Sequence, residues 1–174
     1  MADSPATFMG EPVKEVTYRV LGGQQVVLHE TSYGPIPEQT EHFRFPLAGP
    51  FIHRAKDGVP AWFNWGFAIE FLDGNVPKHV VIEDVTGPKP QLLVDDSTPI
   101  LRSGELPTWH GDAADCVVYI GNPCAAWLFA KRKQHFVLRA TVTLADGSKD
   151  ILHQGIKFDP KALRGLLYSM DIDR

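Results

Sequence analysis

The densest group of chemically active side chains in the sequence lies in residues 109–116, Trp-His-Gly-Asp-Ala-Ala-Asp-Cys. Imidazole, carboxylate and thiol groups of this kind bind transition metals or support a thiolate nucleophile. The segment has neither a Cys-x-x-Cys nor a His-x-x-x-His pair, so we predict no metal site and expect its aspartates to form turns before a strand. The candidates for a metal- or thiol-dependent enzyme are His110, Asp112, Asp115 and Cys116.

Recognised catalytic motifs are missing from the rest of the sequence. It contains no Gly-x-Ser-x-Gly nucleophile elbow, no Gly-x-x-x-x-Gly-Lys phosphate loop and no dinucleotide-binding fingerprint. A distant histidine could still act as a base for Cys116 or Cys124 in the fold. We expect no cofactor and favour a non-enzymatic protein. The histidines are His29, His42, His53, His79, His110, His135 and His153.

Aromatic side chains offer more for binding than the ionisable ones, because tryptophan is enriched at the energetic centres of protein interfaces. Trp109 lies in a polar segment, and Trp62 lies on the face of its predicted strand opposite Trp65. We therefore predict Trp62 and Trp109 in a recognition surface. To this surface we add the segment Phe43, Arg44 and Phe45, whose phenylalanines should also anchor the proline-rich loop around them.

The elements that must position these residues are organised around a β-hairpin predicted over residues 134–158. Its apolar residues occupy every second position in both arms, which is typical of strands with one face toward a core. Asp146-Gly147 between the arms predicts a tight type I′ turn. The face predicted to be buried consists of Phe136, Leu138, Ala140, Val142, Leu144, Leu152, Ile156 and Phe158.

Further strands are predicted from the same alternation. A second hairpin covers residues 13–30, with Gly22-Gly23 as a two-residue turn. The most apolar segment, residues 61–72, is predicted to form one long central strand whose odd-numbered face packs against the first hairpin. The segment His-Phe-Arg-Phe-Pro-Leu is predicted to be an edge strand that Pro46 ends. Shorter strands are predicted at residues 78–86, 91–94 and 116–120.

Two short helices are predicted near the carboxyl end. Asn122-Pro123 suits an N-cap followed by proline at the first helical position, and Lys131-Arg132-Lys133 suits a helix C-terminus. Residues 123–133 are therefore predicted to be helical, with a strand as the alternative because Ala-Trp-Leu-Phe would also suit a sheet. Asp159-Pro160 precedes a second such segment.

The composition fits one domain rich in turns. The 174 residues include 15 glycines and 14 prolines, and strands do not alternate regularly with helices, which argues against a parallel α/β fold. We predict a mainly β protein, an antiparallel β-sandwich of immunoglobulin-like type with one or two short helices. This single domain should span residues 13–174, and residues 1–12 should form a flexible amino-terminal arm.

The charge pattern restricts the partners. A net charge of −4 supplies no positive field for a phosphate backbone, so we expect no nucleic acid partner. No apolar stretch is long enough to span a membrane, and the amino-terminal residues lack the features of a signal peptide, so we predict a cytoplasmic location. In that compartment Cys116 and Cys124 should be thiols, with a disulfide between them as the alternative.

These features together predict a protein-binding module. Two long loops rich in proline and glycine, residues 31–60 and 95–115, are of the kind that carries recognition on a rigid β scaffold. An adaptor, or an inhibitor of the immunity type that masks its partner, would fit, and the negative charge suits a basic partner. Self-association into a homo-oligomer stays open. The alternatives are an enzyme that uses residues 109–116, and a carrier of a small apolar ligand held by Phe63, Trp65, Phe67 and Phe71.

Overall fold

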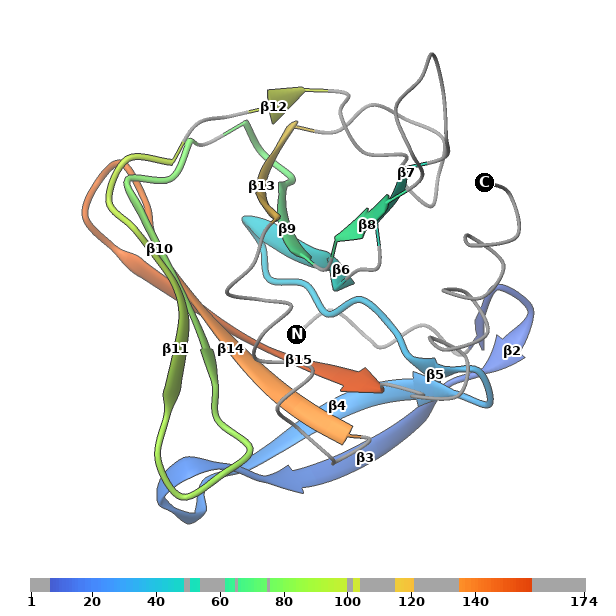
Figure 1. Ribbon diagram of the computed structural model, residues 1–174. Coiled ribbons are helices and arrows are strands. Elements are labelled where there is room, and N and C mark those ends of the chain that lie inside the picture. Colours follow the sequence, from blue (N-terminus) through green and yellow to red (C-terminus); the bar gives the residue numbers. More distant parts are fainter. Residues whose placement is uncertain are drawn as a thin grey trace.

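The computed structural model of the protein describes residues 7–48, 51–53, 62–64, 66–74, 76–99, 102–103, 115–120 and 135–157. These residues are mainly β and form several antiparallel sheets, as predicted (Figure 1). Within them the helical structure is limited to η1 (Leu21–Gly23). No helix in this part of the chain is long and apolar enough to cross a membrane.

The largest hairpin belongs to a four-stranded sheet with the order β11–β10–β14–β15. The predicted hairpin is confirmed, and its arms pair in register from His135 with Lys157 to Thr143 with Lys149. Its predicted inward face is buried at every position that the structure describes. The strands of this sheet are β10 (His79–Asp84), β11 (Gln91–Asp96), β14 (His135–Thr143) and β15 (Lys149–Lys157).

The turn of this hairpin differs from the predicted type I′ turn. The Leu144 N–H donates to the Ser148 carbonyl at 2.8 Å, which leaves a three-residue loop, and of its residues Gly147 alone has a positive φ, 87°. A type I′ turn needs positive φ at both central residues. Asp146 instead accepts hydrogen bonds at Oδ1 from the Ser148 N–H (2.9 Å) and hydroxyl (2.6 Å). These bonds lower the pKa of Asp146.

A second four-stranded sheet has the order β12–β13–β9–β6, so β6 is an edge strand as predicted. The prediction that Pro46 ends this strand is wrong. The pairing register shifts between Arg44 and Leu47, and the strand continues to Ala48. A proline has no N–H to donate, and an irregularity at an edge accommodates it. The strands are β6 (Phe43–Ala48), β9 (Gly66–Phe71), β12 (Arg102–Ser103) and β13 (Asp115–Ile120).

The predicted long strand over residues 61–72 is divided in two. Its first part, β8 (Trp62–Asn64), pairs with β7 (Phe51–His53) in a separate sheet, and β9 begins at Gly66. A glycine within an apolar run has no side chain to pack and often marks such a change of direction. The odd-numbered residues of β9 whose side chains are described, Ile69 and Phe71, are buried as predicted.

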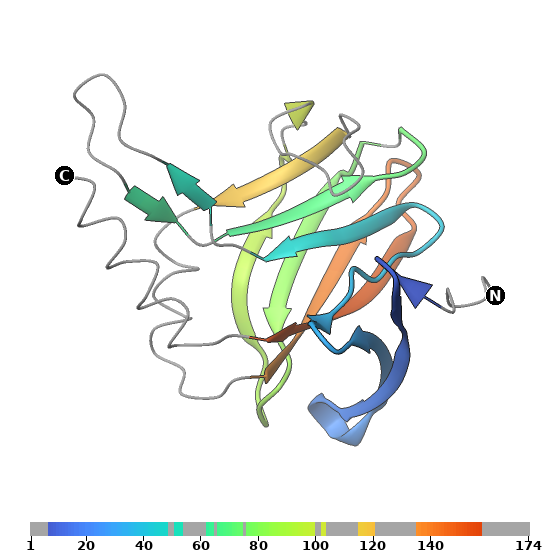
Figure 2. The same cartoon turned by 90° about the vertical axis from the view of Figure 1, so that its right-hand side faces the viewer.

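The main hydrophobic core joins the two four-stranded sheets. In Figure 2 the strands β6, β9 and β13 cross over β10, β11, β14 and β15. Ile69 and Phe71 belong to the same cluster as the inward face of the β14–β15 hairpin, which confirms the predicted packing between these segments. Burial of large side chains on both sheets provides the main driving force for this arrangement. The largest of them are Phe43, Phe45, Phe136, Ile69, Ile82 and Leu138.

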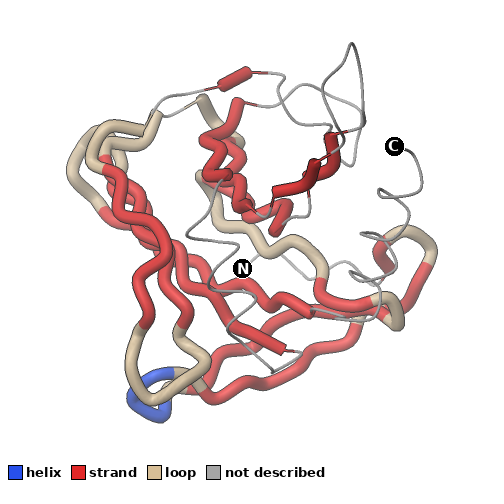
Figure 3. Tube along the Cα trace, viewed as in Figure 1, coloured by secondary structure: helices blue, strands red, loops and turns tan. Residues whose placement is uncertain are grey.

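A three-stranded sheet, β3–β4–β5, covers part of the other face of the β14–β15 hairpin. It contains the second predicted hairpin, β3 (Lys14–Arg19) and β4 (Gln25–Thr31), followed by β5 (Gly34–Pro35). The connecting turn, which includes the blue segment of Figure 3, has three residues where two were predicted, because the Val20 N–H donates to the Gln24 carbonyl. Val20, Val26 and Leu28 pack in a second cluster with Val85 and Val137.

Part of the predicted amino-terminal arm is structured. Its residues β1 (Thr7–Phe8) and β2 (Glu11–Pro12) pair around Met9 and Gly10, which both have positive φ. The two predicted helices, over residues 123–133 and after Pro160, lie outside the described residues. Cys124 does so too, as does the side chain of Cys116, and the structure does not describe a bridge between them.

Candidate functional site

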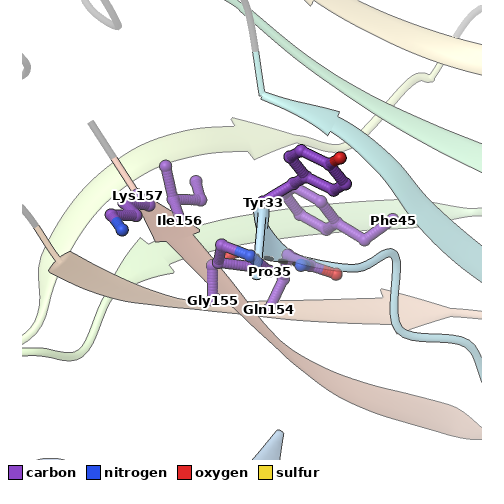
Figure 4. A pocket seen from close by; sticks show the side chains of 7 residues that line it. All are labelled: Tyr33, Pro35, Phe45, Gln154, Gly155, Ile156 and Lys157. Atoms are coloured by element: carbon purple, nitrogen blue, oxygen red, sulfur yellow. Dashed lines mark hydrogen bonds between the residues drawn. The ribbon is translucent and has the colours of Figure 1, made fainter. Parts of the chain in front are cut away.

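An open pocket of about 440 Å³ lies where β5, β6 and β15 meet (Figure 4). Its volume falls within the range of roughly 300–1,000 Å³ that small-molecule sites occupy. Figure 4 shows the rings of Tyr33 and Phe45 at one end and Lys157 at the other. Apolar side chains thus share this surface with a cationic one. The residues that line it are Tyr33, Pro35, Phe45, Gln154, Gly155, Ile156 and Lys157.

Tyr33 is presented by the tight turn between β4 and β5. Thr31 pairs with Gly34 across this turn, and Gly34 adopts a φ of 127° that favours glycine. The Tyr33 N–H donates to the buried Thr31 hydroxyl at 3.2 Å. Tyr33 is 84% exposed. The turn therefore holds an aromatic side chain in solvent at the rim of the pocket.

Gln154 fixes the wall of the pocket. It is 6% exposed and lies on the inward face of β15 between Leu152 and Ile156. Its Oε1 accepts a hydrogen bond from the Glu38 N–H at 2.8 Å, and its Nε2 donates to the carbonyls of Ile36 and Gly155, each at 2.9 Å. The amide therefore fastens residues 36–38 to β15 and has no N–H left for a ligand.

The half-buried carboxylate of Glu38 lies next to this wall. The Glu38 side chain accepts a hydrogen bond from the His29 N–H at 2.6 Å and faces the ring Nδ1 of His29 at 3.0 Å. Burial raises the pKa of Glu38, and the hydrogen bonds from His29 oppose this rise. The Phe45 N–H donates to the Glu38 carbonyl. Neither His29 nor Glu38 lines the pocket, so their role here is structural.

Two further imidazoles pair with carboxylates at the surface. His79 Nε2 lies 2.6 Å from Asp95 Oδ1, and His42 Nδ1 lies 2.5 Å from Asp73 Oδ2. The hydrogen bond that His42 donates to the Asp73 carboxylate raises the pKa of His42. No group of three histidine, cysteine, aspartate or glutamate side chains in the described part of the chain could hold a metal ion.

The structure places the predicted segment Phe43-Arg44-Phe45 mostly inside the molecule. Phe43 is 0% exposed, so its ring offers no area to a partner. Phe45 is also buried but contributes to the pocket lining. Arg44 is ion-paired with Glu70. On an edge strand the alternation turns both rings to the core, which confirms that they anchor the segment.

The other predicted site residues lie largely outside the described part. Trp62 is in β8, but its side chain is not described, and Trp109 is not described at all. Of the enzyme candidates, His110 and Asp112 are not described, and for Asp115 and Cys116 the structure gives the backbone of β13 alone. The ligand-carrier residues Phe63, Trp65 and Phe67 have no described side chains either, whereas Phe71 packs in the core.

Of the residues that line the pocket, sequence reasoning predicted Phe45 as a binding residue and missed the others. Tyr33 follows a strand within Ser-Tyr-Gly-Pro, a composition that indicates a turn with its aromatic side chain outside the sheet. Gln154 has a clearer signal, because the alternation of β15 places it on the apolar face between Leu152 and Ile156. A polar residue at such a position must find partners for its hydrogen bonds, and such partners identify a structural junction.

A half-buried histidine, His153, leads to a prediction about how stability depends on pH. His153 Nε2 is buried without a hydrogen-bond partner, and burial together with the neighbouring Arg139 lowers the pKa of His153. In the unfolded chain His153 takes up a proton near its ordinary pKa of 6.5, whereas in the folded chain the His153 side chain stays neutral to a lower pH. The free energy of unfolding should therefore fall as the pH drops below about 6.5. Replacing His153 with leucine should reduce this slope.

Urea unfolding at a series of pH values from about 7 to about 5 measures the effect. The exposed His135, one strand away, provides the control in the variant His135→Leu. If the free energy of unfolding of His153→Leu falls with pH as steeply as that of His135→Leu and of the unsubstituted protein, the account of His153 is wrong.

No family model, curated protein or solved structure matches this chain. The function has to be argued from the geometry of the pocket.

Proposed function

We propose that the protein is a non-enzymatic module that binds another protein through the pocket between β5, β6 and β15. The observation that supports this proposal is the position of Tyr33, a residue that is 84% exposed on a tight turn at the pocket rim. Tyrosine supplies a large contact area at a low cost in conformational entropy, and it is enriched among the residues that dominate binding energy.

The remainder of the pocket favours the same role. Phe45 and Ile156 are held by the main core, and Gln154 ties residues 36–38 to β15 by two hydrogen bonds. A partner side chain would therefore enter a preformed surface, and a preformed site loses little entropy on binding. An apolar side chain of the partner would pack against Pro35, Phe45 and Ile156, with Tyr33 closing over it.

The protein-binding role that we propose is that of an adaptor or of an inhibitor that masks its partner. The net charge of −4 supports a partner that is basic as a whole. Trp62 and Trp109 stay predicted parts of the recognition surface. The proposal also includes an immunoglobulin-like sandwich made by the two four-stranded sheets, which the core between them supports. A single domain from residue 13 and a cytoplasmic location are further parts of the proposal.

Selection of random linear peptides displayed on phage, with the purified full chain as bait, tests the proposal. We expect enriched peptides whose affinity falls about tenfold or more in Tyr33→Ala, since truncation of a dominant interface residue costs this much. Tyr33→Phe should keep most of the affinity. The control is Ile151→Ala, which removes another exposed apolar side chain, 54% exposed and outside the pocket lining.

Two results would contradict the proposal. One is the absence of any enriched peptide. The other is enrichment of peptides that bind Tyr33→Ala as well as they bind the unsubstituted protein. A small molecule that copurifies with the protein in native mass spectrometry, and that Tyr33→Ala loses, would favour a ligand carrier in its place.

A further inference from the structure

Some polar groups in the pocket lining already form hydrogen bonds within the protein, and others do not. The Gln154 amide is fully engaged with Glu38, Ile36 and Gly155. For the Tyr33 hydroxyl and the Lys157 ammonium the described part of the structure contains no hydrogen bond and no ion pair. These two groups, at opposite ends of the pocket in Figure 4, are therefore available to a bound molecule.

Lys157 is the last residue of β15, and its side chain passes close to Gly34 of β5. Its Cδ lies 3.9 Å from the position that a Cβ on Gly34 would take, so the aliphatic part of the side chain passes over β5 at a residue without a side chain. The lysine is exposed, and no carboxylate in the described residues lies within 4.0 Å of its ammonium group. The pocket thus has a positive end and an aromatic end.

We infer that the bound segment of the partner carries an acidic side chain that pairs with Lys157, next to an apolar side chain that fills the pocket. This inference rests on the proposed function and adds the chemistry of the partner. A free chain terminus is the less suitable source of the carboxylate, because proteins usually capture chain ends with a nest of backbone N–H groups, whereas Lys157 is a single flexible ammonium at the rim.

The local charge makes this recognition selective. The chain as a whole carries a net charge of −4, which disfavours the approach of an acidic segment, whereas Lys157 attracts its carboxylate locally. A segment with a basic residue at the same position would meet a like charge there. Such repulsion is a common source of discrimination between partners.

The same phage selection tests the inference when the enriched peptides are sequenced and their acidic and basic residues are compared. These peptides are joined to the phage by their carboxyl ends, so any carboxylate they present is a side chain. We expect the enriched sequences to share an aspartate or glutamate at a fixed spacing from an apolar residue. The affinity of the synthetic peptide should fall about threefold in Lys157→Met, as for a partly exposed ion pair, and about tenfold in Lys157→Glu.

Exchanging the charges of Lys157 and of the acidic residue in the peptide tests whether the two groups pair directly. A peptide with lysine in place of its acidic residue should bind Lys157→Glu better than it binds the unsubstituted protein. The control is Lys89→Glu, which makes the same change at an exposed lysine outside the pocket lining. Enriched peptides that need Tyr33 but lack an acidic residue, or that bind Lys157→Glu unchanged, would overturn the inference and leave the proposed function intact. The absence of any peptide that needs Tyr33 would overturn both.

Discussion

Replacing Phe43 with alanine should lower the free energy of unfolding by about 3–5 kcal/mol, because a fully buried phenylalanine leaves a cavity that the core closes only in part. Phe43 is 0% exposed and packs in the core between the two four-stranded sheets. Its strand, β6, is at the edge of its sheet, with one neighbouring strand to hold it. Urea denaturation followed by circular dichroism measures the loss.

Two control variants test whether the loss of stability comes from the buried volume of the ring. Phe43→Leu keeps much of the buried volume and should cost clearly less than alanine. Leu92→Ala removes a side chain that is 57% exposed, and should change the stability by about 0.5 kcal/mol or less. If Phe43→Ala cost no more than Leu92→Ala, the ring would not be part of the core, and its predicted role in the binding surface would regain support.

Breaking the ion pair between Arg44 and Glu70 should have an effect of similar size. Both Nε (2.8 Å) and Nη2 (2.6 Å) of Arg44 donate to Glu70 Oε2, and the Glu70 side chain is 7% exposed. Arg44→Met would leave this carboxylate buried without its partner. We expect a loss of about 3–5 kcal/mol in the free energy of unfolding, the cost of an uncompensated buried charge.

The double variant Arg44→Met/Glu70→Leu distinguishes this cost from lost packing. It should be much more stable than Arg44→Met alone, because apolar side chains can replace a buried pair with little loss. Arg139 and Glu83 form the comparison pair, since they are more exposed, at 27% and 20%, and share one hydrogen bond of 3.0 Å. Arg139→Met should cost about 1 kcal/mol or less. Additive effects at Arg44 and Glu70 would show that the pair is not coupled.

Local patterns in the sequence were sufficient to predict the hairpins. Alternation fixes which side chains of β14 and β15 face the core, and a glycine at the turn fixes where the chain reverses. The turn type was wrong because Asp-Gly also suits a three-residue loop, in which the Asp146 carboxylate accepts hydrogen bonds from Ser148 and Gly147 alone has a positive φ. The single strand predicted over residues 61–72 was wrong because apolar periodicity does not reveal which partner strand each half will find.

The pocket could not be predicted, because its parts come from distant positions. Gln154 bonds to Glu38 across 116 residues and to Ile36 across 118. The sequence shows that a polar side chain falls on an apolar face, but not which backbone groups satisfy it. In the same way, the alternation of residues 43–45 separates Arg44 from the two phenylalanines. Which of the two faces is buried depends on β9, which follows more than a dozen residues later.

The hydrogen bonds of Gln154 also affect how the protein behaves in crowded solution. β15 is the last strand of its sheet, and the backbone groups along such an edge can pair with a strand from a second molecule. Residues 36–38 are hydrogen-bonded to the Gln154 side chain, so they cover one face of this edge strand. We therefore expect the side chain that shapes the pocket wall also to limit the access of a second molecule to this edge strand.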